Sequence, residues 1–206
     1  MEKITAFRSK LVPLLIPNVD TDQIIPAQFV SSRTTDEFAY ALFRNRKDRD
    51  PEFVLNRPEM QGRTVILAGA NFGCGSSREA APWALVAGGI RAVISSGFGD
   101  IFNNNSLKNG LLPIAVSEAD HSRIVEAFES SPELEVVVDL PAGTLSVPDH
   151  GIEITLQIDP FYRHLLVNGM DELDYLLSHI SDIERYETSD QLHPTTRNRL
   201  ATQPTQ

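Results

Sequence analysis

The chain has 206 residues and a formal net charge of −10, which fits one domain with an acidic surface. Because nucleic-acid binding needs clustered Lys and Arg to neutralise phosphates, this charge predicts no nucleic-acid partner. Neither a signal-peptide pattern nor an apolar stretch of membrane-spanning length occurs, so we expect a cytoplasmic protein without membrane contact.

The N-terminal third mixes extended and turn-forming segments. Residues 4–16 are expected to be extended, and residues 18–22 to form a polar turn. A short helix is expected around residues 37–43. The remainder of residues 31–62 is charged and irregular, and is predicted to be a long loop, which in a compact domain is usually functional or mobile.

Residues 65–128 alternate between short apolar runs and helix-like runs. Strands are predicted at residues 65–68, 92–95 and 112–116. Helices are predicted at residues 78–87 and 100–108 and, after Ser117 as N-cap, to about residue 128. This alternation of strands and helices favours parallel α/β packing.

The pattern changes after the third helix. Short strands at hairpin spacing are predicted at residues 135–139, 144–147 and 153–158, and they favour an antiparallel layer. Two helices, around residues 160–168 and 170–183, are expected to close a domain spanning residues 1–187. Residues 188–206 are polar without periodicity and are predicted to be a disordered tail.

The segment Gly73-Cys74-Gly75-Ser76-Ser77-Arg78-Glu79 leaves the first predicted strand of the core and opens a helix. Such a turn gathers free backbone N–H groups and the positive end of the helix at one point. Two hydroxyls and a guanidinium join them, so the segment predicts a site for a carboxylate or phosphate. Arg78 is unfavourable in a first helical turn unless an anion lies nearby.

The residues of this turn disfavour three other motifs. A P-loop needs Lys where Ser76 stands, and a dinucleotide fingerprint needs Gly where Arg78 stands. No Gly-x-Ser-x-Gly elbow surrounds either serine, which disfavours a serine hydrolase. A purely structural role, with Ser76 capping the helix, stays open beside the anion site.

Three segments carry a resemblance to a known family. The run from Asn71 to Glu79, followed by Pro82-Trp83-Ala84-Leu85, resembles the signature of 3-isopropylmalate dehydratase small subunits, which correspond to the swivel domain of aconitase-type hydro-lyases. Residues 18–26 resemble the N-terminal hallmark of that family, and residues 159–173 its bacterial C-terminal region. Ala80 departs from the pattern, because the family usually has His there.

The resemblance implies a fold and a set of roles. The fold is a three-layer β/β/α swivelling domain with a partly parallel central sheet and an additional antiparallel layer. Ser76 is implied as the base that removes a proton beside a carboxylate, and Asp22 as a second catalytic residue. Ser77, Arg78 and, at a weaker match, Arg33 are implied to bind substrate. For Asp22, a role as a turn residue stays open. Residues 28–35 are expected to contact the alkyl group of the substrate.

The resemblance also implies a partner. Aconitase-type reactions use a [4Fe–4S] cluster whose open iron acts as a Lewis acid. Cys74 is the only cysteine, so no cluster or other metal is expected on this chain, and an iron–sulfur large subunit is implied to supply it.

The implied activity is the interconversion of 2-isopropylmalate and 3-isopropylmalate through isopropylmaleate in leucine biosynthesis, with a small dicarboxylate as substrate. Two alternatives stay open from the residues alone. One is a related hydro-lyase subunit for methylmalate/citraconate, dimethylmalate or homoaconitate, and the other is an anion-binding module without catalysis.

Overall fold

A computed structural model describes residues 1–75 and 78–188 of the chain. Within these residues the strands form one seven-stranded sheet, in the order β4-β3-β2-β1-β5-β6-β7. The strands are β1 (Ala6–Leu14), β2 (Val65–Ala68), β3 (Ala92–Ser95), β4 (Leu112–Ala115), β5 (Glu135–Asp139), β6 (Thr144–Val147) and β7 (Ile152–Thr155).

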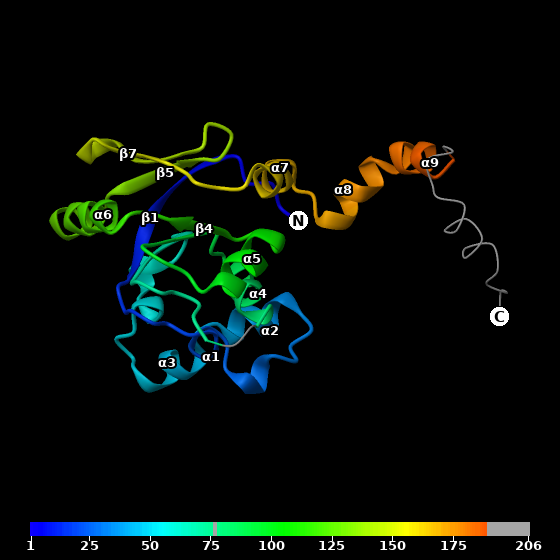
Figure 1. The fold of residues 1–206 in the computed structure, drawn as a ribbon. Helices are drawn as coiled ribbons and strands as arrows, with labels where there is room; N and C mark the ends of the chain where they lie inside the picture. The colour runs from blue at the N-terminus through cyan, green and yellow to red at the C-terminus, as the bar shows by residue number, and fades with distance from the viewer. Residues whose placement is uncertain (76–77, 189–206) are drawn as a thin grey trace.

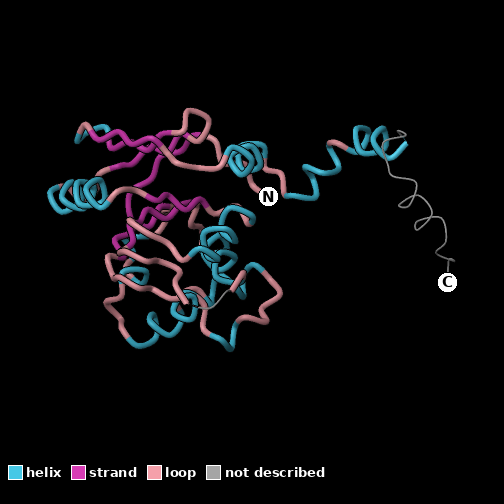
Figure 2. The backbone as a smooth tube through the Cα atoms, viewed as in Figure 1, coloured by secondary structure: helices cyan, strands magenta, loops and turns pink. Residues whose placement is uncertain are grey.

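Helices fill the segments between and after the strands (Figures 1 and 2). The α-helices are α1 (Thr21–Ile24), α2 (Thr35–Ala41), α3 (Arg44–Arg49), α4 (Ala80–Ala87), α5 (Asp100–Lys108), α6 (Glu118–Ser130), α7 (Pro160–Asn168), α8 (Glu172–Ser178) and α9 (Ile180–Thr188). None of the helices in this described part of the chain combines the length and the apolar run that crossing a bilayer requires.

The sheet has a parallel half and an antiparallel half that share β1. Leu11 to Leu14 pair in parallel with β2, and β2, β3 and β4 continue in parallel. Ala6 to Lys10 pair antiparallel with β5, and β6 and β7 follow as hairpins. The nine residues of β1 therefore belong to both halves, and Figure 2 shows the antiparallel strands lying across the end of the parallel ones.

Two hydrophobic clusters cover the two faces of the parallel half. The side chains of β2 alternate between them, since Ile66 and Ala68 belong to one cluster and Val65 and Leu67 to the other. Residues from α1, α2 and α4 complete the first cluster. Residues from α6 and the antiparallel strands complete the second. This arrangement confirms the predicted fold, with the antiparallel layer joined to the central sheet through β1.

Three expectations from the sequence were wrong in detail. Residues 44–49 form the helix α3 rather than a loop, and 3-10 turns follow at Val54–Asn56 and Pro58–Met60. The helix predicted from residue 78 begins at Ala80. The last predicted helix is divided, because α8 ends before His179 and α9 begins at Ile180. Of the tail predicted at residues 188–206, Thr188 is the last residue of α9, and residues 189–206 lie outside the described residues.

Arg63 joins the parallel half to the antiparallel half beneath the sheet edge. Its guanidinium donates hydrogen bonds to the Leu11 carbonyl at 2.8 Å and to Glu133 Oε1 at 2.7 Å, and its Nε donates to the Glu59 carbonyl at 3.0 Å. Lys10 Nζ donates to the other oxygen of Glu133 at 2.7 Å. A buried arginine is tolerated here because acceptors satisfy its donors.

Candidate active site

The two loops with sequence motifs meet at the carboxyl ends of β1 and β2. Because these strands are parallel neighbours, both loops leave the sheet at the same edge. Backbone hydrogen bonds then tie the loops together, from Gly73 N–H to the Val19 carbonyl at 2.7 Å and from Thr21 N–H to the Cys74 carbonyl at 3.1 Å. An isolated parallel bridge between Asp20 and Cys74 continues the pairing.

The glycine turn is compact enough to exclude side chains at two positions. Gly73 has φ of +71°, and a Cβ atom on it would lie 2.2 Å from Cγ of Phe102 on α5. A Cβ atom on Gly99, just before α5, would lie 2.5 Å from the Gly73 carbonyl oxygen. The turn is therefore pressed against the start of α5.

The two aspartates of the N-terminal loop have different roles. Asp20 is the N-cap of α1, and its Oδ1 accepts a hydrogen bond from Gln23 N–H at 2.7 Å. Asp22, in the first turn of α1, instead turns to the other loop, where its Oδ1 lies 2.6 Å from Nη2 of Arg78. The turn-residue role that stayed open for Asp22 thus belongs to Asp20.

Arg78 is the positive group at the centre of the site. Its side chain is 21% exposed, and that of Asp22 is 54% exposed. The second terminal nitrogen, Nη1, is buried and has no hydrogen-bond partner among the described residues. A buried charged donor without an acceptor is costly. An added carboxylate could accept from Nη1 while Nη2 remains paired with Asp22.

The position of Arg78 differs from the expected one. It precedes α4, and the N-cap residue of the helix is Glu79, whose side chain makes no cap hydrogen bond. Trp83 of α4 donates from Nε1 to Asn109 Oδ1 at 2.7 Å, and Asn109 Nδ2 donates to Glu79 Oε1 at 3.1 Å. This chain of contacts fixes the first turns of α4 against the end of α5, and thereby the backbone that carries Arg78.

Ser76 and Ser77 lie outside the described residues, between the described Gly75 and Arg78. Arg33 lies in the segment before α2, where its backbone N–H donates to Glu37 Oε2 at 2.7 Å. Its side chain is exposed, and it has no ion pair with the described part of the chain. Of the predicted site residues that are described, the structure therefore brings Asp22 and Arg78 together.

A cavity of about 510 Å³ lies beside Asp22 and was not predicted. Its lining residues are Asp20, Asp22, Gln23, Asn45, Arg46, Arg49, Asp50 and Phe53. Nε of Arg46 donates to Gln23 Oε1 at 3.2 Å, which ties α3 to α1. The one signal for it in the sequence is the basic run of residues 44–49, which lies in the predicted loop.

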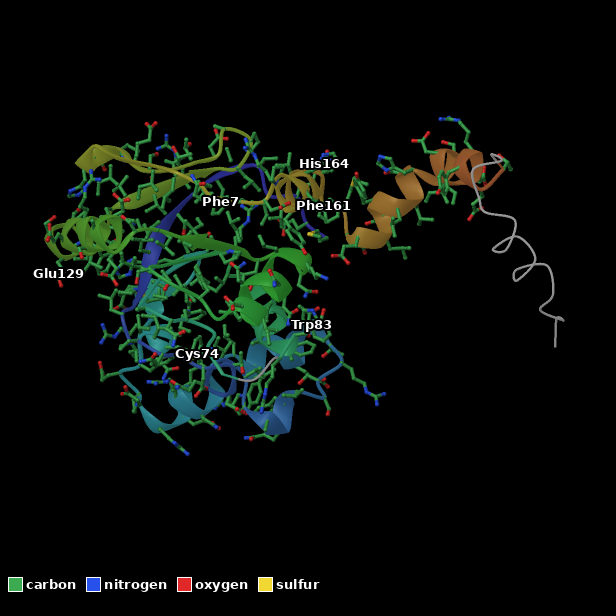
Figure 3. The ribbon with its side chains drawn as sticks, viewed as in Figure 1. Phe7, Cys74, Trp83, Glu129, Phe161 and His164 are labelled. Atoms are coloured by element: carbon green, nitrogen blue, oxygen red, sulfur yellow. The ribbon has the colours of Figure 1, made fainter. Side chains whose placement is uncertain are left out.

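The residues of this chain do not fit an iron–sulfur cluster. A cluster needs several thiolates, and Cys74 is the only cysteine. Cys74 lies in the bridge with Asp20 (Figure 3), and among the described residues no three His, Cys, Asp or Glu side chains gather as a metal site. Ala80, at the position where the resembled family usually has His, is the first residue of α4 and is buried in the first hydrophobic cluster.

Comparisons with known proteins agree with these features. A family model described as the aconitase C-terminal domain matches residues 1–119. A protein of Solibacter usitatus named 3-isopropylmalate dehydratase small subunit is 50% identical over 98% of this chain and all of its own length. A Roseiflexus sp. protein of the same name is 45% identical over 92% of this chain and 95% of its own.

A solved structure supports the same assignment. The crystal structure of 3-isopropylmalate dehydratase from Methanocaldococcus jannaschii superposes with a TM-score of 0.66 and 27% identity, and it covers 88% of this chain and 99% of its own. Fold, site geometry and relatives agree, and the chain belongs to the 3-isopropylmalate dehydratase small-subunit family, within the aconitase C-terminal domain family.

Proposed function

We propose that this chain supplies the carboxylate-binding half of a hydro-lyase that interconverts 2-isopropylmalate and 3-isopropylmalate in leucine biosynthesis, and that it acts together with a large subunit in the cytoplasm. The supporting observation is Arg78, which has Nη2 paired with Asp22 at 2.6 Å and Nη1 buried without an acceptor among residues 1–75 and 78–188. A dicarboxylate substrate provides that acceptor, and the names of the relatives favour isopropylmalate over the other branched malates.

In the proposed reaction, Arg78 binds one substrate carboxylate and Ser76 removes the proton from the carbon beside it. The electron pair of that C–H bond forms the double bond of isopropylmaleate, and the hydroxyl leaves the neighbouring carbon and takes up a proton to become water. Re-addition of water with the opposite regiochemistry gives the isomer. A serine base needs its alkoxide stabilised, and the guanidinium two residues further along the chain is a suitable cation.

The remaining assignments rest on the sequence motifs. Ser77 binds substrate beside Ser76. Arg33 is a second substrate-binding arginine and residues 28–35 contact the alkyl group, if that segment approaches Arg78 when the large subunit is bound. The large subunit carries the [4Fe–4S] cluster, since the cysteine content of this chain does not suit one. No nucleic acid takes part.

The test is co-expression with an iron–sulfur large subunit, followed by an anaerobic hydratase assay with isopropylmalate and the other branched malates. Ser76→Ala is expected to abolish turnover while the two subunits still associate. Arg78→Lys replaces a fork by a point charge that cannot hold Asp22 and a carboxylate together. It is expected to lower kcat/KM by about 10- to 100-fold, the effect of losing one charged hydrogen bond.

The matched control is Arg123→Lys. Arg123 also forms an ion pair, with Asp120 at 3.0 Å, but it lies on α6, which packs on the opposite face of the sheet from α1. The kcat/KM of the complex with Arg123→Lys should match that of the unaltered complex. Full turnover in the Ser76→Ala complex would exclude the serine base, and equal effects of the two Lys substitutions would exclude Arg78 as the carboxylate ligand.

A further inference from the structure

The C-terminal helices α8 and α9 form an arm that leaves the body of the protein at α7. In Figures 1 and 2 the arm points away from the body, and it starts far from α1 and α3, beside which the candidate site lies. Neither helix packs extensively on another element of the described chain. We define the arm as residues 171–188.

One side of α8 anchors the arm to the body. Glu172 Oε1 pairs with Lys108 Nζ of α5 at 3.0 Å. The ring of Tyr175 lies edge-on to Phe161 at 5.0 Å and to His164 at 5.9 Å between ring centres, and both partners belong to α7 (Figure 3). Glu172 and Tyr175 are three residues apart and share one helix face. The base of the arm is therefore fixed by specific contacts.

The other side of the arm is apolar and exposed. Leu173 is 63% exposed, Leu176 and Leu177 are each 55% exposed, and Ile180 is 48% exposed. Leu173, Leu176 and Leu177 are three and four residues apart and lie on one side of α8, and Ile180 follows them at the start of α9. Large apolar side chains gathered on one exposed stripe mark an interaction surface, and helices that bind a groove use anchors at this spacing.

The charges beside the stripe distinguish between two possible occupants. The arm contains six acidic residues and one basic residue, Arg185. Arg185 is already paired with Asp182 at 2.9 Å. Packing two arms of identical chains against each other would bring like charges together, which disfavours a second copy. A groove with an apolar floor and a basic rim matches both the stripe and its flanks.

We propose that the arm docks into an apolar, basic-rimmed groove on the large subunit, as a second contact separate from the one around Arg78. This inference rests on the proposed function, because it takes the large subunit as the partner. Two separated contacts explain why Glu172 and Tyr175 of α8 make specific contacts with the body while Leu173, Leu176 and Leu177 are left exposed. The arm then contributes affinity without touching substrate.

The test uses the full chain with Leu173→Gln and Leu177→Gln together, since Gln keeps the helix propensity of Leu while removing the apolar anchors. Affinity for the large subunit is measured by titration calorimetry. Removing two leucines that become buried in the complex is expected to weaken binding by roughly 100-fold, about tenfold for each. The control is Val86→Gln, which alters an exposed apolar residue of α4 and should leave affinity unchanged.

Salt provides a second readout. Binding of the unaltered chain should weaken as ionic strength rises, because exposed charges are screened, and Glu184→Lys should weaken binding at low salt.

Unchanged affinity in the double variant, with the unaltered chain binding normally, would overturn the arm contact alone. A lowered melting temperature of the isolated variant would mean that the stripe packs on its own body. A dimer of the isolated chain that the double variant abolishes would mean that a second copy is the partner. Failure of the unaltered chain to bind the large subunit would overturn the arm contact and the proposed function together.

Discussion

Replacing Gly73 by Ala tests how tightly the glycine turn is built. Two costs are expected. The first arises because φ of +71° is unfavourable for a residue with a Cβ atom, at about 1–2 kcal/mol. The second arises because the added Cβ would lie 2.2 Å from Cγ and 2.7 Å from Cβ of Phe102. These atoms are at the root of the side chain, so rotation of the ring cannot move them away.

The surroundings of Phe102 make the second cost unavoidable. Its ring is buried and packs against Phe72 at 5.4 Å and Phe98 at 6.3 Å between centres, so α5 itself would have to shift. Overpacking of this kind costs about 1–3 kcal/mol. The matched control is Gly62→Ala, where φ is +79° but no atom lies within 4 Å of the added Cβ. Only the backbone cost applies there.

The assay is urea unfolding of both variants, with equal slopes confirming comparable unfolded states. Gly73→Ala is expected to lose about 1–3 kcal/mol more than Gly62→Ala, and its melting temperature should fall by a further ~2–4 °C per kcal/mol at this chain length. Equal losses in the two variants would refute the reasoning, because they would show that the contact with Phe102 carries no cost.

Two further predictions concern charged groups. The pKa of Glu133 is held below its ordinary value of 4.5 by hydrogen bonds from Lys10 and Arg63, so the folded state binds this proton less readily than the unfolded state. The contribution of Glu133 to stability is present above pH 4.5 and is lost as pH falls through the lowered pKa. The free energy of unfolding of Glu133→Gln, measured against pH, should therefore fall less at acid pH than that of the unaltered chain. An identical pH profile for the two proteins would contradict this prediction. Asp22→Asn should lower kcat/KM by about 10- to 100-fold, because Arg78 loses the partner that positions it. The double variant with Arg78→Lys should lose less activation free energy than the sum of the two single losses. Full additivity would show that the two side chains act independently.

The parallel core could be predicted closely because its signals are local. The run at residues 65–68 is entirely buried in β2, and such continuous apolar runs are typical of strands covered on both faces. Gly88 and Gly89 end α4 as expected, and Ser117 caps α6 by accepting from Asp120 N–H. Each of these features depends on residues a few positions apart.

Features that depend on distant contacts could not be predicted. The sequence of α3 has no apolar periodicity, and the helix instead begins where Phe43 N–H donates to the Ile24 carbonyl at 2.8 Å and gains an ion pair between Arg44 and Asp48. The pairing of Asp22 with Arg78 likewise requires β1 and β2 to be adjacent. The residue types were apparent from the motifs, whereas their contact was not.

The sharing of β1 by both halves of the sheet has a consequence for biosynthesis. β1 precedes both of its partners in the chain, and its C-terminal part pairs with β2, whereas its N-terminal part must wait for β5, which follows α6. During translation the edge formed by Ala6 to Lys10 therefore stays unpaired for much longer than the edge formed by Leu11 to Leu14. Unpaired strand edges are prone to aggregate during folding, so Ala6 to Lys10 are the part of β1 that is exposed to this hazard for longest.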